Sequence, residues 1–91
     1  MPKIIPQKNN LRIKSQDDNF IVFNLETSGF HLLTKDCIDI LEAIDGKKSI
    51  VDLAHYFASE RNLEFDNLYK DFQKFFDELE TRKLVTLKQE D

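Results

Sequence analysis

The chain has 91 residues, of which 41% are hydrophobic and 33% charged, and its formal net charge is −4. These values are those of one folded globular domain rather than a disordered chain. The negative charge disfavours nucleic acid and anionic membranes as partners, because binding to phosphate requires a basic surface. A single cysteine forms no internal disulfide, and no stretch has the length of a signal peptide or membrane helix. We therefore expect a soluble cytoplasmic protein.

The first half of the chain is predicted to form strands. Residues 1–10 hold both prolines and are predicted to be an extended arm. Residues 11–14 (LRIK) alternate between apolar and basic, as in a half-buried strand, and residues 20–25 (FIVFNL) are mostly β-branched and aromatic. A polar turn separates these two segments from one another, and a second polar turn precedes a third strand at residues 30–33 (FHLL). The expected arrangement is an antiparallel meander with the second strand in the centre.

The second half is predicted to form three helices. Thr34 is a candidate N-cap for the first, which is expected to end at Asp45-Gly46. The sequence SIVD at residues 49–52 has the form of a capping box and begins the second helix. Asp66 is a candidate cap for the third helix, and residues 84–87 could add a short terminal strand. We therefore expect a single α+β domain over residues 11–88, of winged helix-turn-helix type, with a three-stranded antiparallel sheet followed by three helices.

No pattern of catalytic or metal-binding residues stands out. Two glycines form no phosphate-binding loop, and the chain has no cysteine pair and no histidine pair at helical spacing. We expect Cys37, His31 and His55 to be structural residues. The acidic residues between positions 36 and 45 are expected to form a solvated helix face, because the spacing of these acids matches no calcium-binding loop. The sequence predicts a protein that is not an enzyme and holds no metal or cofactor.

An unguarded strand edge is the clearest sign of a binding surface. The first strand carries Arg12 and Lys14, which discourage pairing between strand edges, whereas residues 30–33 carry no proline, lysine or glutamate. If residues 30–33 form an edge strand, they can accept an extended peptide as an additional strand.

The third helix has more aromatic residues than one face requires. At about 100° per residue, a core stripe and a flanking stripe are expected: Leu68, Phe72, Phe75 and Leu79 in the core stripe, and Phe65, Tyr69 and Phe76 in the flank. If the flank faces residues 30–33, an apolar groove lies between them. If it does not, these aromatic residues complete the core, and the residues alone leave both interpretations open.

The order of several short motifs resembles the PqqD-like family, the peptide-recognition domains of pathways that modify ribosomally made peptides. The motifs are FNLETSGFHLLT, ILEAIDG and LYKDFQKFFDEL, and the resemblance covers residues 20–87. Asp45-Gly46 matches directly, whereas Thr34 follows Leu33 where the family usually has asparagine. Lys83 departs from the glycine that the family often has before its terminal apolar pair.

The third helix carries the rest of the resemblance. Asp71-Phe72, Phe75-Phe76 and Leu79 match the family pattern, with phenylalanine in place of smaller aliphatic residues. Each motif is short and degenerate, so their order along the chain is the informative feature.

The resemblance implies a non-catalytic adaptor that binds the leader segment of a precursor peptide and presents it to a modifying enzyme of the same pathway. The leader would lie as an added strand along residues 30–33, against the helix at residues 66–82. The residues assigned to the peptide are Phe30, His31, Leu32 and Leu33 from the strand, and Phe65, Tyr69, Phe72, Gln73 and Phe76 from the helix. The sequence does not identify the precursor, the enzyme or the type of modification. It also does not show which alternate residues of the third strand face the groove.

Two other classes of function are disfavoured. A small winged-helix DNA-binding regulator is opposed by the acidic charge and by the scatter of its basic residues (Arg61, Lys70, Lys74 and Arg82) among acids. A fragment of a catalytic subunit is opposed by the lack of a catalytic pattern. We expect a monomer.

Overall fold

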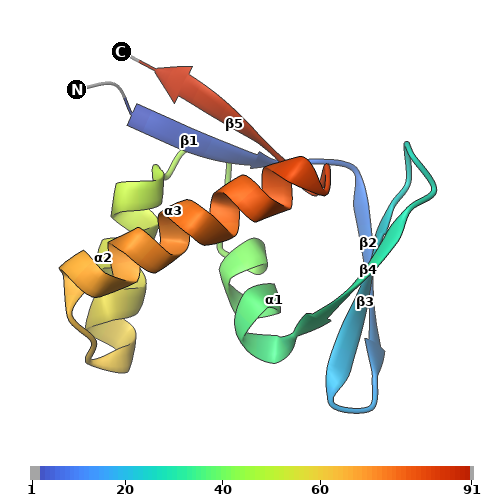
Figure 1. Cartoon of the computed structure of the whole chain (residues 1–91), viewed down its shortest axis with the longest axis horizontal. Helices are drawn as coiled ribbons and strands as arrows, with labels where there is room; N and C mark the ends of the chain where they lie inside the picture. Colours follow the sequence, from blue (N-terminus) through green and yellow to red (C-terminus); the bar gives the residue numbers. More distant parts are fainter. Residues whose placement is uncertain (1–2, 91) are drawn as a thin grey trace.

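The computed structural model describes residues 3–90 and contains three helices and two small antiparallel sheets (Figure 1). In chain order the elements are β1 (Lys3–Lys8), β2 (Leu11–Gln16), β3 (Asn19–Asn24), β4 (Phe30–Thr34), α1 (Lys35–Glu42), α2 (Ile50–Arg61), α3 (Phe65–Thr81) and β5 (Val85–Glu90). The expected α+β fold, in which a three-stranded antiparallel sheet precedes three helices, is confirmed.

The three-stranded sheet has the order β2-β3-β4, so β3 is central and β4 lies at an edge. Val22 of β3 lies opposite Ile13 of β2 and His31 of β4. Val22 is fully buried, and the same face of the sheet presents the buried Leu33 to the helices. The alternation of apolar residues in the sequence thus corresponds to one face on the core, as is usual in antiparallel sheets.

The second sheet is a pairing that the sequence did not indicate. β1 pairs with β5, and Pro6, which is buried, lies opposite Leu87. Proline has no N–H, so it is tolerated where a strand has a free side, as both strands of a two-stranded sheet do. Residues 3–8 of the expected arm are therefore held against the C-terminal strand, while residues 1–2 lie outside the described residues.

The helix boundaries differ in part from the prediction. The capping box at the start of α2 is confirmed: Asp52 N–H donates to Ser49 Oγ and Ser49 N–H donates to the Asp52 carboxylate, each at 3.1 Å. Thr34 is the N-cap residue of α1, but its hydroxyl donates to Cys37 Sγ (3.4 Å) and makes no capping bond. The prediction of Asp66 as the N-cap of α3 is wrong, because the N-cap is Glu64, two residues earlier, and the helix begins at Phe65.

The end of α1 also differs. The helix ends at Glu42, before the expected Asp45-Gly46, although Gly46 does have a left-handed conformation with φ of 80°. The Asp45 carboxylate accepts the N–H groups of Lys47 and Lys48, which forms a turn rather than a helix cap. These bonds lower the pKa of Asp45 from its ordinary value. A Cβ at position 46 would lie 2.7 Å from Oε1 of Gln7, whose amide donates to the Gly46 carbonyl.

The buried stripe of α3 is centred about one residue away from the predicted stripe. Phe72, Phe76 and Leu79 are buried, whereas Leu68 and Phe75 are only half-buried. The expectation that Phe76 belongs to an open flank is wrong, since its side chain is fully enclosed and its ring packs against Phe72 and Phe75.

Asn24 connects the β3–β4 turn to the turn that follows α3. Its side chain is buried, with the amide donating to the Lys83 carbonyl at 2.6 Å and the carbonyl accepting the N–H groups of Glu26 and Thr27. Asn9 donates to the same Lys83 carbonyl at 2.7 Å. These bonds hold the C-terminal end of α3 beside the start of β4.

Lys83 adopts a left-handed conformation, with φ of 63°. A residue with a Cβ loses about 1–2 kcal/mol in this region, and glycine does not. We expect Lys83→Gly to raise the free energy of unfolding by about 0.5–1 kcal/mol, after allowing for the greater freedom of glycine in the unfolded chain. Urea denaturation measures the change. Asn62, with φ of 54°, is the matched control, because asparagine tolerates this conformation and Asn62→Gly should change stability less. A destabilised Lys83→Gly variant would contradict the expectation.

The capping box predicts a pH dependence. The N–H of Ser49 stabilises the charged carboxylate and lowers the pKa of Asp52 from its ordinary value of 3.8, against the opposing effect of desolvation. A lowered folded-state pKa stabilises the protein above the unfolded-state value, and this stabilisation is lost as the pH falls through the folded-state value. Asp52→Asn should therefore be less stable than the parent at neutral pH, and the difference should shrink below about pH 4. Thermal melts across this range test the expectation, and a difference that is independent of pH would refute it.

Candidate functional site

The hydrogen bonds of the central strand determine which side each β4 residue faces. Asn24 N–H donates to the Gly29 carbonyl and Leu25 N–H donates to the Asn10 carbonyl, each at 2.9 Å and each between directly opposed residues. Bonded pairs alternate along an antiparallel ladder. Even-numbered residues of β3 therefore bond to β4, and odd-numbered residues bond to β2.

This alternation leaves half of the β4 backbone unpaired. His31 and Leu33 lie opposite the even-numbered Val22 and Phe20, so their N–H and C=O groups face β3. Phe30 and Leu32 direct theirs away from β3, and among residues 3–90 β4 pairs with β3 alone. The open side of β4 is formed by the backbone of Phe30 and Leu32, together with Thr34 at the end of the strand, which lies opposite the odd-numbered Asn19.

The side chains of β4 divide in the same way. His31 is half-buried and Leu33 is buried on the face that meets the helices. Phe30 and Leu32 point to the opposite face, where 68% and 60% of their surface is exposed. The question of strand parity is thereby answered: His31 and Leu33 lie on the helix side, and Phe30 and Leu32 lie on the outer side.

The predicted helix wall is not beside β4. Tyr69 and Gln73 line a hollow of about 400 Å³ whose other walls include Ile4, Asp52 and Leu87, from β1, α2 and β5. The Phe65 ring stacks on His55 of α2 at 3.9 Å and on Tyr69 at 5.6 Å. The β1–β5 pair lies along this flank of α3, and Gln73 stays exposed at the hollow between them.

The two buried helix residues of the predicted site are core residues. Phe72 is 3% exposed and Phe76 is fully enclosed. Phe72 packs edge-on against Phe57 of α2 and against Phe76, with ring centroids 5.9 Å apart in each case. A bound peptide can therefore meet these residues only through the side chains that cover them.

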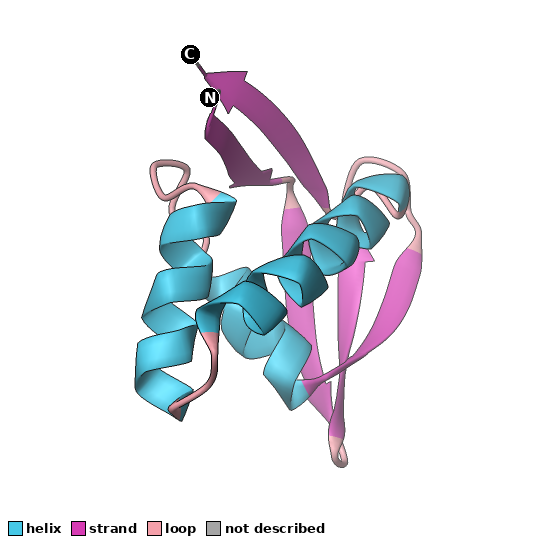
Figure 2. Ribbon diagram, turned by 60° about the vertical axis from the view of Figure 1, so that its left-hand side comes forward, coloured by secondary structure: helices cyan, strands magenta, loops and turns pink. Residues whose placement is uncertain are grey.

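The flank of α3 away from Tyr69 and Gln73 carries two half-buried apolar residues. Leu68 and Phe75 are half-buried and lie on the side of the helix away from Tyr69 and Gln73, since about 100° separates successive residues. The β1–β5 pair lies on one side of α3, while α1, which directly follows β4, lies on the other (Figure 1, Figure 2). Leu68 and Phe75 were expected in the core, and both are only half-buried.

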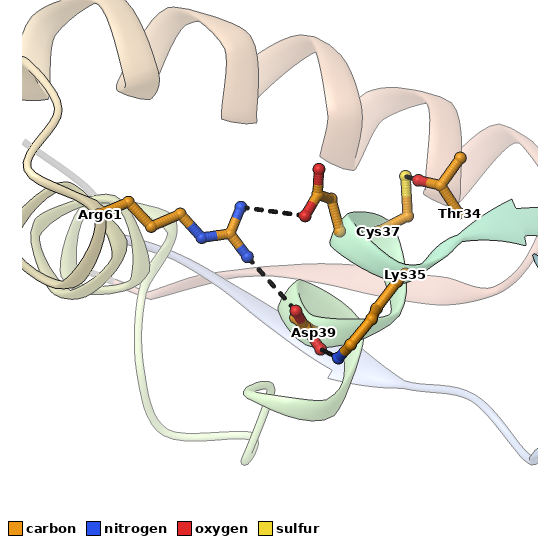
Figure 3. A network of polar contacts seen from close by, with 6 residues as sticks. Thr34, Lys35, Cys37, Asp39 and Arg61 are labelled. Atoms are coloured by element: carbon orange, nitrogen blue, oxygen red, sulfur yellow. Dashed lines mark hydrogen bonds and ion pairs between the residues drawn. The ribbon is translucent and has the colours of Figure 1, made fainter. Parts of the chain in front are cut away.

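A polar network holds α1, the continuation of β4, against α2 (Figure 3). The Arg61 guanidinium at the end of α2 lies 3.6 Å from the Asp36 carboxylate and 3.5 Å from that of Asp39. Asp39 also pairs with Lys35 at 3.1 Å. Exposed pairs of this kind contribute little stability singly, but a shared guanidinium restricts how the two helices approach one another.

The described part of the chain offers no site for a metal ion. Within residues 3–90 no three histidine, cysteine, aspartate or glutamate side chains gather closely enough to hold one. Cys37 is half-buried and packs against the core. No helix over the same residues is long and apolar enough to cross a membrane.

Comparison with known proteins identifies the family. Searches of curated proteins and of solved structures found no significant match. A family profile described as "Coenzyme PQQ synthesis protein D (PqqD)" matches residues 19–85, which include β3, β4 and all three helices. The match leaves out β1, β2 and most of β5, and it covers well over half of the chain. The chain therefore belongs to the PqqD family.

Proposed function

We propose that this protein binds the leader segment of a ribosomally synthesised precursor peptide as an added strand on β4 and presents it to a modifying enzyme. Members of the PqqD family are small, non-catalytic, peptide-binding partners of biosynthetic enzymes. The observation that carries the proposal for this chain is the open side of β4, where the backbone of Phe30 and Leu32 has no partner strand within residues 3–90. An exposed sheet edge is the usual receptor for an extended peptide.

The other edge of the sheet is less suited to a peptide. β2 carries Arg12 and Lys14, and such charges discourage pairing with another strand. β4 carries no charged residue, and α1, which directly follows it, lies on the side of α3 away from the β1–β5 pair (Figure 1). We assign the half-buried Leu68 and Phe75 to this flank of α3. We therefore assign the leader to the space bounded by β4 and this flank of α3.

Backbone pairing alone does not account for useful affinity. Phe30 and Leu32 together offer up to four hydrogen bonds, which contribute about 2–6 kcal/mol at about 0.5–1.5 kcal/mol each. Micromolar binding corresponds to about 8 kcal/mol, and an unstructured peptide also loses conformational entropy when it is ordered. Side-chain contacts must supply the remainder, and Leu68 and Phe75 are the helix residues placed to supply part of it.

The surface of α3 does not favour a DNA-binding regulator. The helix carries five acids and two lysines, and the whole chain is acidic. A helix with this balance of charge repels the phosphate backbone. A monomer located in the cytoplasm remains our expectation, and residues 30–34 would be free in it to receive the peptide.

The first test compares two proline substitutions on β4. Leu32→Pro removes an N–H that faces the open side, so the protein should stay folded and lose binding of a leader peptide. His31→Pro removes an N–H that faces β3, and the loss of an internal ladder bond should destabilise the fold by about 3 kcal/mol or more. Thermal melts and titrations with a fluorescent peptide, selected by the parent protein from a random display library, separate these outcomes.

Phe30→Pro repeats the test at the second position whose N–H faces the open side. It shows whether a loss of binding in Leu32→Pro comes from the missing N–H or from the missing leucine side chain. A folded Leu32→Pro or Phe30→Pro variant that binds the peptide as tightly as the parent would rule out strand addition to β4.

The second test compares the two flanks of α3. Phe75 and Tyr69 are both half-buried aromatic residues of this helix, on opposite flanks of its buried stripe, and our proposal assigns only the Phe75 flank to the peptide. Truncation of either to alanine should cost stability, and Phe75→Ala alone should weaken peptide binding, by about tenfold or more if the peptide covers the ring. Equal affinities of Phe75→Ala and the parent, or a larger loss for Tyr69→Ala, would place the peptide elsewhere.

A further inference from the structure

The outer face of the three-stranded sheet becomes more apolar toward β4. The register places Arg12, Phe23 and Phe30 in one row across the sheet. Lys14, Ile21 and Leu32 form a second row. Each row begins with a cation on β2, continues with a half-buried apolar residue on β3 and ends with an exposed apolar residue on β4.

The exposed ends of these rows belong to the residues whose backbone is open. The rings of Phe23 and Phe30 lie 6.3 Å apart, so Phe30 is supported on its inner side by β3 and uncovered at the edge. In a parallel or an antiparallel pair, directly opposed residues of neighbouring strands point their side chains to the same face of the sheet. The residues of an added strand beside Phe30 and Leu32 therefore point to the outer face and extend the two rows by one position each.

We propose that Phe30 and Leu32 select the leader through these outer-face contacts, so that the leader carries two apolar residues two positions apart. The residue between them faces the helices, beside His31, Leu68 and Phe75. The substrate class is thus a short peptide segment with apolar residues on both faces of the added strand. This inference rests on the proposed function, because it requires strand addition to β4.

The apolar gradient favours a peptide over a protein laid across the whole sheet. The apolar ends of both rows are at the open edge, and the charged ends, Arg12 and Lys14, are at the far edge. A second copy of the chain is opposed by charge. It would bring together two chains that each have a formal net charge of −4.

The expected size of the effect follows from cross-strand pairs in sheets. One such pair changes an equilibrium by about two- to fivefold, and the outer row supplies two of them. Replacing either outer-face residue of a bound peptide by alanine should therefore weaken binding by about two- to fivefold.

The experiment is a selection from a random-peptide display library with the full chain and its variants. The parent should enrich peptides with an apolar pair two positions apart. Leu32→Lys should enrich an acidic residue at one position of that pair and leave the other positions unchanged, and Phe30→Lys should do the same at the other position. Leu25→Lys is the matched control, because Leu25 is 53% exposed and lies outside β4, so it should select the same peptides as the parent.

The outcomes separate the inference from the proposed function. If the lysine variants are folded and select the parental peptides, the outer-face contacts do not determine specificity, although strand addition stands where Leu32→Pro abolishes binding. If the parent enriches no peptide, or if Leu32→Pro binds as the parent does, both proposals fail. If ultracentrifugation shows a dimer of the parent that Leu32→Lys dissociates, a second copy occupies the edge and the inference is overturned.

Discussion

The buried amide of Asn24 is the interaction on which the geometry of the proposed binding surface depends. It donates to the Lys83 carbonyl after α3 and accepts two N–H groups of the turn before β4. Strand and helix are far apart in the sequence, and this side chain joins their ends directly. A buried amide that satisfies several backbone groups stabilises the structure only when all its partners are in place, so it also specifies a single arrangement of the two walls.

The second sheet determines which flank of α3 is available. β1 and β5 lie along the flank that carries Tyr69 and Gln73, and the N–H of Leu87 donates to the Glu80 carboxylate at 3.0 Å. The half-buried apolar residues on the other flank of α3 are Leu68 and Phe75. The pairing of β1 with β5 thus occupies one side of α3, and the peptide site that we propose lies on the other side.

The open edge combines two features that soluble proteins usually avoid together. β4 has unpaired backbone groups and also exposes large apolar side chains, and edges of this kind tend to pair with other chains. An edge of five residues supplies few hydrogen bonds, so a receptor for peptides gains from apolar contacts on both faces of the added strand. The same property that makes the edge a liability in isolation makes it suitable for a transient peptide partner.

Local patterns in the sequence determined the strands of the meander, the capping box of Ser49 and Asp52, the unguarded character of residues 30–33 and the order of motifs shared with the PqqD family. These features depend on residues close together in the chain, whose periodicity and hydrogen-bonding groups are visible without a fold. The tertiary structure alone decided that residues 3–8 pair with β5, that Phe76 is in the core, and that Phe30 and Leu32 face the open side. Each of these depends on contacts between distant segments, and an amphipathic helix or a short apolar strand is compatible with more than one such contact until the whole chain is packed.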